Sequence, residues 1–397
     1  MPNHRHGSSW MIPIALLLPL FSATSADYRS GMDHYSSGDY ASAAEEFRAL
    51  IDVSPEYDFG YYMLGLCLLR EQASDAAIAS LRRAIELDQG QFKYRLGLGQ
   101  AQIRAGDYTG AAETLDNAES LIDDEVEFDF YSNRGYALAA LKRWPEAVRD
   151  LEHADRVRPD QAAVVGRLGV GYFYSKEYER AISTLRRAGR MSSDTETHDW
   201  LLAEALLRAT PGDPEIRARH YSEAVSVAER LLADHPNDLE AAYLLGRAAL
   251  GAGDYDRAAE SIERFLAGRP DHCFAWLNLS RARMALGRWN DAGESLTQAI
   301  ECDDEMLPAH LSLGLVYRVQ GELERSLAVY ERAYDRWPSV ALQKSIEDVR
   351  HNIAVRVHNA GVEEQARKDA TVQEELDRQR QELLDRIEIW TKSTRDD

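Results

Sequence analysis

The side chains that could do chemistry are scattered through this chain of 397 residues and do not lie at catalytic spacings. There is no glycine–serine–glycine nucleophile elbow, no glycine-rich phosphate loop followed by lysine, and no paired-cysteine metal motif. His351 and His358 lie seven residues apart on one face of a predicted helix. They could hold a metal, but without acidic or thiol partners nearby an exposed helix face is the favoured interpretation. The sequence therefore predicts a protein that is not an enzyme and needs no cofactor or metal.

The first 26 residues have the features of an export signal. Arg5 is their only formal charge, the stretch from Trp10 to Phe21 is apolar apart from two prolines, and small residues fill positions 22–26. This order is typical of a cleaved secretory signal peptide, and the apolar run is shorter than the roughly 20 residues that span a bilayer. An uncleaved anchor is the alternative. We expect cleavage after residues 1–26, export to a bacterial periplasm, and no stable membrane insertion.

The charge of the chain indicates which partners it can bind. The formal net charge is −21, and removal of residues 1–26 makes it −22. Phosphate binding depends on Lys and Arg, so such a surface repels nucleic acid and anionic membranes. The expected partner is a protein or peptide, and not a nucleic acid.

A spacing of about 34 residues organises the rest of the chain. Leu-Gly pairs mark it, as at 64–65, 98–99 and 245–246, and a Gly-Asp loop such as 106–107 follows each time, or a variant of it. Because Gly ends a helix and Asp begins the next, each unit is predicted to be a helix pair. A unit this short cannot bury its own apolar face, so the units must stack into a solenoid. Nine such units begin near residues 24, 58, 92, 128, 162, 196, 239, 273 and 307.

The landmarks within each unit resemble the motif of the tetratricopeptide repeat family. They are a glycine at the eighth position, an aromatic residue after the loop, such as Tyr40 or Tyr108, and an alanine three residues later, such as Ala43 or Ala111. The resemblance covers residues 24–340 and implies an all-α, right-handed α-solenoid of about nine helix pairs, which we assign to residues 27–340. It is specific for the fold and unspecific for function, because this fold serves many unrelated binding roles.

Two units depart from the pattern. The sixth carries an insertion of roughly nine residues between Thr210 and His220, which predicts a protruding loop or a longer second helix. The fourth begins after Asp123-Asp124-Glu125, which we interpret as a solvated acidic turn, since a calcium loop needs spaced oxygen ligands.

The three cysteines are too few for a disulfide-dense module. Cys67 lies inside a predicted helix and is expected to be a small buried residue. Cys273 opens the first helix of one repeat and Cys302 closes its second helix. Antiparallel helices bring these ends together, so either a disulfide or two free thiols is expected.

Beyond the repeats, two further helices are predicted. Apolar residues recur at three- and four-residue steps over residues 341–358, as expected of a helix that caps the last repeat. Residues 359–397 are strongly charged, with a weak heptad that includes Leu376, Leu383 and Ile387. This tail is predicted to be a solvated helix, with weak self-association or docking through it as the alternative.

The family resemblance also indicates where a ligand binds. In tetratricopeptide repeats the first helices line a concave groove, and its positions in this sequence hold many aromatic residues and arginines with few acids. The central groove is expected to carry most of the binding energy. The predicted peptide-binding residues are Tyr136, Arg167, Phe173, Trp200, Tyr243, Arg247, Arg281 and Arg318.

The resulting hypothesis is a non-enzymatic scaffold of the cell envelope. Its groove would hold an acidic or aromatic-rich segment of a protein and so support assembly of an envelope, secretion or maturation complex. Arginine favours acidic segments because it pairs carboxylates bidentately. The alternative is an accessory subunit of an enzyme or glycan-active complex, with a saccharide or cell-wall fragment in the groove.

Overall fold

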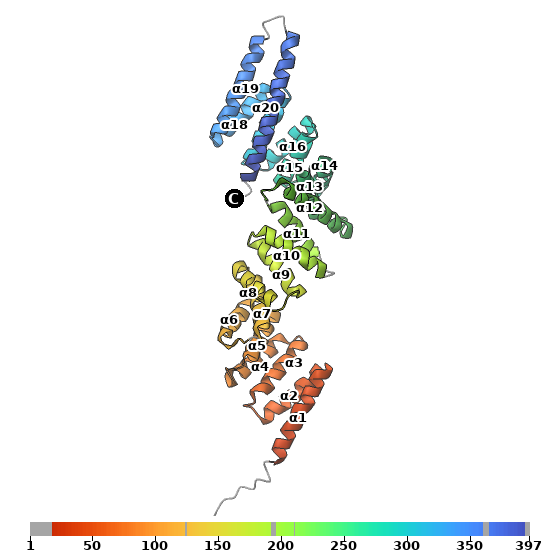
Figure 1. The fold of residues 1–397 in the computed structure, drawn as a ribbon, viewed down its shortest axis with the longest axis vertical. Coiled ribbons are helices and arrows are strands. Elements are labelled where there is room, and N and C mark those ends of the chain that lie inside the picture. Colours follow the sequence, from red (N-terminus) through yellow and green to blue (C-terminus); the bar gives the residue numbers. More distant parts are fainter. Residues whose placement is uncertain (1–17, 124, 192–195, 210, 360–364, 394–397) are drawn as a thin grey trace, which may run out of the picture. The chain divides into compact units, whose positions relative to one another are not determined.

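The computed structural model describes residues 18–123, 125–191, 196–209, 211–359 and 365–393, and they form helices joined by short turns (Figure 1). Two compact units divide the chain, residues 1–193 and 194–397. We call them unit 1 and unit 2 and describe each by itself. Both are stacks of helix pairs without any strand in the described part, so the predicted all-α repeat fold is confirmed.

Unit 1 contains five helix pairs and a short 3-10 helix. Its elements are α1 (Leu18–Ser37), α2 (Tyr40–Val53), α3 (Asp58–Arg70), α4 (Ser74–Leu87), α5 (Phe92–Ala105), α6 (Tyr108–Asp116), the 3-10 helix η2 (Glu119–Leu121), α7 (Glu127–Ala140), α8 (Trp144–Val157), α9 (Ala162–Tyr174) and α10 (Tyr178–Met191).

Unit 2 contains four helix pairs and two further helices. They are α11 (Glu196–Arg208), α12 (Pro214–Asp234), α13 (Leu239–Ala252), α14 (Tyr255–Gly268), α15 (Cys273–Ala285), α16 (Trp289–Cys302), α17 (Leu307–Val319), α18 (Leu323–Arg336), α19 (Val340–Asn359) and α20 (Gln365–Ser393). Seen over both units, the pairs number nine in the described residues, as predicted.

The glycine that recurs in the first helix of most repeats has a steric cause. A Cβ atom added at Gly65 would lie 2.5 Å from Leu81 Cγ, and one added at Gly246 would lie 2.5 Å from Ile262 Cγ1. Both glycines lie where the first helix of a pair crosses the second helix. At this position only a small residue fits. The two repeats that lack glycine here have the fully buried Ala203 and Ser280 instead.

The predicted Gly-Asp loops are present in the structure. Gly106 has φ +80° and ends α5, and the side chain of Asp107 accepts the N–H of Gly110 at 2.9 Å. Gly253 and Asp254 repeat this arrangement between α13 and α14. Glycine adopts this left-handed conformation without a steric penalty, and Asp satisfies a free N–H group of the following helix.

The two departures from the repeat pattern take defined forms. The insertion of the sixth unit lengthens the second helix: α12 has 21 residues and begins at Pro214, and Asp213 caps it through the N–H groups of Glu215 and Ile216. Ahead of α7, Asp123 accepts the N–H groups of Glu125 and Val126. Asp124 lies outside the described residues.

The cysteines have two environments. Cys67 is buried in α3, and burial raises the pKa of its thiol to about 12. Cys273 and Cys302 form a disulfide, with their Cα atoms 5.4 Å apart, so the bridged alternative is the one that the structure contains.

The N-terminal prediction is only partly covered by the structure. Residues 1–17 lie outside the described residues, and Leu18–Ala26 form the start of α1, so this helix begins ahead of the predicted cleavage boundary. Export and cleavage therefore stay predictions. Among the described residues no helix combines the length and the apolar character needed to cross a bilayer.

Helices α19 and α20 follow the last repeat. Leu342, Ile346 and Val349 of α19 pack against Leu323 and Tyr330 of α18, which covers the apolar side of that repeat. Figure 1 shows α20 running back beside α19, and it packs against α17. The charged tail is therefore helical, as predicted, but it is not a solvated extension: its middle lies on the repeats.

Candidate functional site

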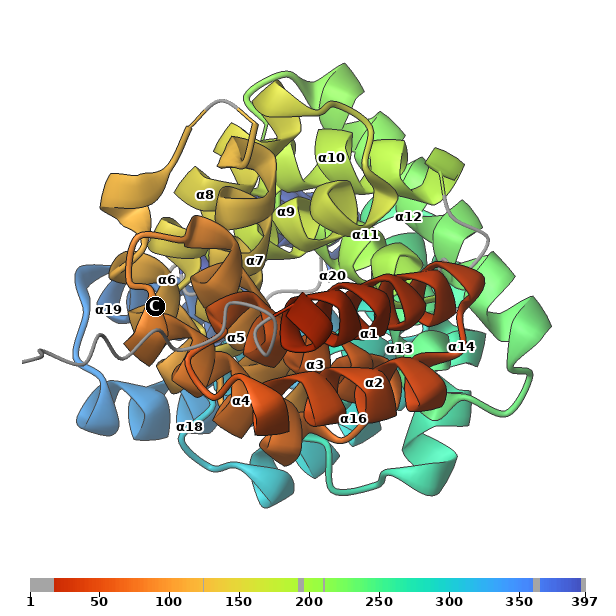
Figure 2. The ribbon, with the colours of Figure 1, turned by 90° about the horizontal axis from the view of Figure 1, so that it is seen from below.

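The first helices of the repeats form one continuous surface in each unit. Consecutive first helices touch one another: α3, α5, α7 and α9 in unit 1, and α11, α13, α15 and α17 in unit 2. Figure 2 shows α5, α7 and α9 on the inner side of the stack of unit 1, with α6, α8 and α10 on its outer side. We call this surface the first-helix face of each unit. Solenoids commonly bind their partners on such concave surfaces.

An aromatic cluster with one cation lies on the first-helix face of unit 1, on α3 and α5. The Nζ atom of Lys93 is 4.7 Å from the ring centre of Phe59, 5.7 Å from that of Tyr62 and 5.4 Å from that of Tyr94. Tyr94 is buried and donates its hydroxyl to Asp58 at 2.6 Å, which fixes the ring. Lys93 itself is exposed. The cluster thus presents an ammonium group above rings that are held in place.

A second cation–ring pair joins two of the predicted residues. The guanidinium carbon of Arg167 lies 4.2 Å from the ring centre of Tyr136, and Nη1 of Arg167 donates to the carbonyl of Ala163 at 3.0 Å. Nearby, Trp144 and Tyr174 stack with ring centres 4.6 Å apart, and Tyr174 is 51 % exposed. Phe173 was expected on the surface but is buried, with its ring 5.9 Å from that of Tyr178. It is a core residue of its repeat.

The cations of this face share one property. None of them forms an ion pair with a carboxylate among the residues that the structure describes, whereas several arginines elsewhere in unit 1 do, such as Arg134 and Arg180. The group consists of Arg29, Arg70, Lys93, Arg104 and Arg167. Asp129 is the acid that the repeat positions place on the same face. By its repeat positions, the face therefore carries five cations and one acid, and none of these cations forms an ion pair among the described residues.

In unit 2, two arginines of the first-helix face form ion pairs with a carboxylate. Arg247 of α13 donates through Nη1 to Glu204 Oε1 of α11 at 2.5 Å, and Arg208 donates through Nε to Glu204 Oε2 at 2.9 Å. Burial raises the pKa of Glu204, but the two guanidinium groups outweigh burial and hold this pKa below its usual value. Arg247 was predicted to bind a ligand because helix-end complementarity did not explain it. Its intramolecular partner Glu204 explains it.

The other predicted residues of unit 2 also have local partners. Tyr243 stacks on Phe265 with ring centres 4.6 Å apart and accepts a hydrogen bond from Asn278 Nδ2 at 2.9 Å. Arg281 donates to Asn278 Oδ1 at 3.2 Å. Trp200 is half-buried in α11. The bond between Tyr243 and Asn278 joins α13 to α15.

Arg318 differs most from its expected position. It is 1 % exposed, because α20 covers it, and Nη2 donates to the main-chain oxygen of Gln379 at 3.2 Å. The sequence predicted that Arg318 lies on an open surface, because nothing in residues 359–397 indicated that this tail folds back onto the repeats. Only the apolar side chains of α20, such as Leu383 and Ile387, could have indicated this contact.

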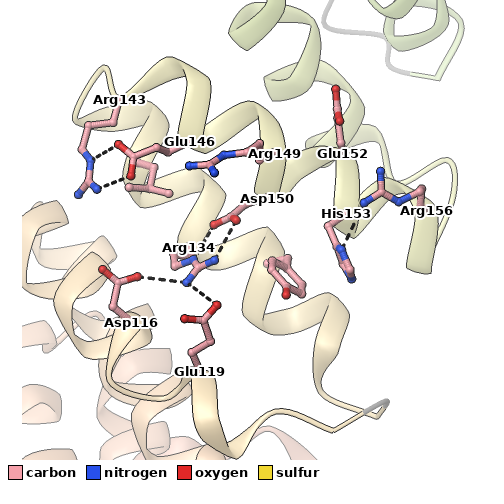
Figure 3. A pocket seen from close by; sticks show the side chains of 12 residues that line it. Asp116, Glu119, Arg134, Arg143, Glu146, Arg149, Asp150, Glu152, His153 and Arg156 are labelled. Atoms are coloured by element: carbon pink, nitrogen blue, oxygen red, sulfur yellow. Dashed lines mark hydrogen bonds and ion pairs between the residues drawn. The ribbon is translucent and has the colours of Figure 1, made fainter.

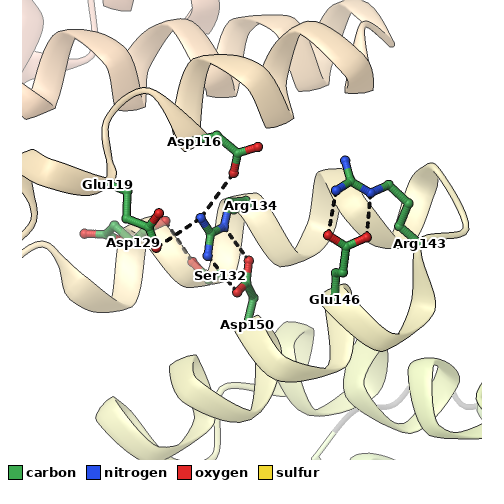
Figure 4. Close-up of polar contacts among 8 residues, drawn as sticks. All are labelled: Asp116, Glu119, Asp129, Ser132, Arg134, Arg143, Glu146 and Asp150. Carbon is green, nitrogen blue, oxygen red and sulfur yellow. Dashed lines mark hydrogen bonds and ion pairs between the residues drawn. The ribbon is translucent and has the colours of Figure 1, made fainter.

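A polar pocket of about 520 Å³ lies on α7 and α8 of unit 1 (Figure 3). Its centre is Arg134, which bonds Asp150 with Nε at 2.6 Å and Nη2 at 3.0 Å. Nη1 of Arg134 also lies 3.2 Å from Asp116 and 3.6 Å from Glu119 (Figure 4). Burial lowers the pKa of Arg134, but these carboxylates raise it above its usual value, so the group stays charged. The sequence analysis missed this network. Its ion pairs tie α6, η2, α7 and α8 together, which is a structural role at the irregular joint before α7.

Within the described ranges, no three His, Cys, Asp or Glu side chains are grouped so as to hold a metal ion. His351 is exposed, and the side chain of His358 lies outside what the structure describes.

Comparison with known proteins identifies the repeats. The tetratricopeptide repeat family model matches residues 28–92, 75–124, 96–162 and 277–341, about half of the chain. A model for subunit 3 of the anaphase-promoting complex, or cyclosome, matches residues 217–299. A peroxisomal targeting signal receptor from Candida glabrata is 27 % identical over 114 residues, which are 29 % of this chain and 19 % of the receptor. The chain thus spans about a fifth of that relative.

Solved structures with similar folds share little sequence with this chain. The C-terminal part of a repeat-containing protein from Cytophaga hutchinsonii is 19 % identical and covers 64 % of this chain and 99 % of its own, with a TM-score of 0.47. The pilF protein of Pseudomonas aeruginosa is 16 % identical, and the match covers 56 % of this chain and 96 % of that protein, with a TM-score of 0.45. The MamA protein is 19 % identical and covers 43 % and 91 %, with a TM-score of 0.39. With nine observed helix pairs and family matches at both ends of the repeat region, this chain belongs to the tetratricopeptide repeat family.

Proposed function

We propose that the protein is a non-catalytic scaffold that binds an acidic segment of a partner protein on the first-helix face of unit 1. One observation carries the proposal: the five cations of this face form no ion pair among the described residues, and three of them, Arg70, Lys93 and Arg167, lie over aromatic rings. Aromatic rings offer rigid contact area, and cations supply charge complementarity to carboxylates. The sequence favoured the central part of the groove as the binding site. The proposed site lies in unit 1 instead, because Arg247 already forms an ion pair with Glu204.

The proposal is tested by reversing one charge in the full-length chain. Fluorescence anisotropy would measure the binding of three labelled peptides with the same apolar residues and with Glu, Gln or Lys at the remaining positions. We expect the Glu peptide to bind best, and Lys93→Glu to weaken it about tenfold, since one close charge contact is worth roughly 1–2 kcal/mol.

Arg82 provides the matched control for this experiment. It is an exposed arginine of α4, a second helix, and forms no ion pair among the described residues. Arg82→Glu makes the same change of net charge outside the first-helix face and should leave the affinity within about twofold. Equal losses from both variants would show only a general charge effect, and equal binding of the three peptides would refute the proposed preference.

We further propose that the protein acts in the cell envelope after export. The order of charge, apolar run and small residues in positions 1–26 supports this. Mass spectrometry of the protein from its native cells should find a mature N-terminus near Ala26 or Asp27. An intact Met1 in the envelope fraction, or recovery from the cytoplasm alone, would contradict the proposal.

A further inference from the structure

Helix α20 lies on the last repeat of unit 2 in the way a bound peptide would. It packs against α17, a first helix, and not against the outer side of the repeat. Its side chains Leu383, Arg386 and Ile387 line a cavity of about 110 Å³ together with residues of α17, α18 and α19, among them Leu311, Tyr330 and Leu342. Farther along, Arg380 lies over the ring of Trp289 at 4.1 Å. The surface that α20 covers is thus the first-helix face of unit 2.

Two buried polar groups under α20 are left without the partners they need. Nη1 of Arg318 and the hydroxyl of Tyr330 form no hydrogen bond, and both side chains are 1 % exposed. The bond from Arg318 to the oxygen of Gln379 uses a main-chain carbonyl inside a helix, which is a weaker acceptor for a cation than a carboxylate. A buried guanidinium group that is not hydrogen-bonded to a carboxylate costs free energy.

The charges that α20 brings to this place are mixed. Burial lowers the pKa of Arg318 and raises that of Tyr330. The positive charge of Arg386 lowers both pKa values, Asp348 of α19 raises both, and Glu382 of α20 raises that of Arg318. Neither carboxylate forms an ion pair with Arg318 among the described residues. Elsewhere in unit 2, the comparable Arg247 has Glu204. The buried Arg318 could pair with a carboxylate of a ligand, but helix α20 places Arg386 near it.

We propose that the pocket of α17, α18 and α19 that Tyr330 lines, together with the buried Arg318 of α17, is a second binding site for an acidic amphipathic helix of a partner protein, and that α20 occupies it as an internal substitute. The apolar side of α20 shows that the pocket accepts a helix. The unsatisfied guanidinium group shows that the preferred helix carries a carboxylate where α20 has Arg386. This site is independent of the function proposed for unit 1.

The first test removes the buried charge. In the full-length Arg318→Leu variant, hydrogen–deuterium exchange of the α20 amides should become about tenfold slower, because an apolar side chain of similar size removes an uncompensated charge. A helix anchored by Arg318 would respond in the opposite direction. Unchanged or faster exchange of α20 therefore overturns the proposal.

The second test supplies the missing carboxylate. Arg386→Glu in the full-length chain should slow exchange of α20 about tenfold, and this gain should disappear when it is combined with Arg318→Leu. Arg378→Glu is the matched control, since it reverses the same charge on the exposed side of α20. A gain that persists in the double variant, or that the control reproduces, would exclude a specific carboxylate site.

The third test asks whether the site is open to a ligand from outside. A labelled synthetic peptide of residues 365–393 that carries Arg386→Glu should bind the full-length protein at least tenfold more tightly than the peptide of native sequence. Arg318→Leu should abolish this difference. If neither peptide displaces α20, even at the highest concentration at which it stays soluble, α20 is a permanent part of the fold and the proposal fails.

Discussion

The availability of a charged side chain depends on its neighbours more than on its position in a repeat. Arg167 and Arg247 both lie on the first helix of a repeat, but Arg167 lies over a tyrosine ring and Arg247 bonds Glu204. The repeat positions predicted that both arginines lie on the first-helix face. They could not predict the pairing, because Glu204 is 43 residues from Arg247 and the contact depends on how two side chains extend between adjacent helices.

The pairing of Glu204 leads to a prediction about stability and pH. The folded state lowers the pKa of Glu204, so the pair stabilises the fold above the unfolded-state pKa near 4.5 and loses this contribution as the pH falls through the lowered folded-state value. Glu204→Gln should reduce the free energy of unfolding by about 2 kcal/mol at pH 7, because two guanidinium groups lose their partner.

Urea unfolding between pH 3 and pH 7 measures this difference. The gap between the native protein and Glu204→Gln should shrink at the acid end of the range. Glu294→Gln, at an exposed site on α16, should change the free energy of unfolding by less than about 0.5 kcal/mol throughout. A gap that stays constant with pH would show that the variant acts through packing and not through charge.

At the scale of elements, the motif predicted helix starts within a residue or so for most repeats. The predicted starts at 58, 92, 162, 239, 273 and 307 are the first residues of α3, α5, α9, α13, α15 and α17. This accuracy has a physical basis, since a glycine at the helix crossing and a capping Asp each permit few alternatives. The sequence did not predict that α20 folds back onto α17. Its heptad was weak, and the contact joins segments about 60 residues apart.

The turns between helices provide the second stability prediction. Lys142 has φ +59° in a turn where other repeats have glycine, such as Gly106 with φ +80°. A side chain in the left-handed region costs about 1–2 kcal/mol, part of which the greater flexibility of unfolded glycine offsets. Lys142→Gly should therefore raise the free energy of unfolding by roughly 0.5–1 kcal/mol.

The matched opposite change is Gly106→Ala, which should lower stability by a similar amount. Urea-unfolding midpoints of the two variants and the native protein make the comparison. If Lys142→Gly lowers the midpoint, the lysine side chain contributes contacts that exceed the backbone strain.

At the scale of the whole molecule, a net charge of −21 coexists with unneutralised cations on the first-helix face of unit 1. The two are compatible, because at physiological salt charges are screened beyond about 8 Å, so that a ligand in contact responds mainly to the nearest groups. Unit 2 has no comparable open cluster among its described residues: Glu204 neutralises Arg247, and α20 covers Arg318. We therefore expect acidic peptides to bind the first-helix face of unit 1.

The most direct measurement of this claim is a hydrogen–deuterium exchange footprint of the full-length protein with and without the bound Glu peptide. We predict slower exchange in α3, α5, α7 and α9, centred on Lys93 and Arg167, with little change in α13 and α15. The same footprint should be lost in Lys93→Glu. Protection confined to the second helices, or to α13 and α15 while α3 and α5 stay unchanged, would contradict the account.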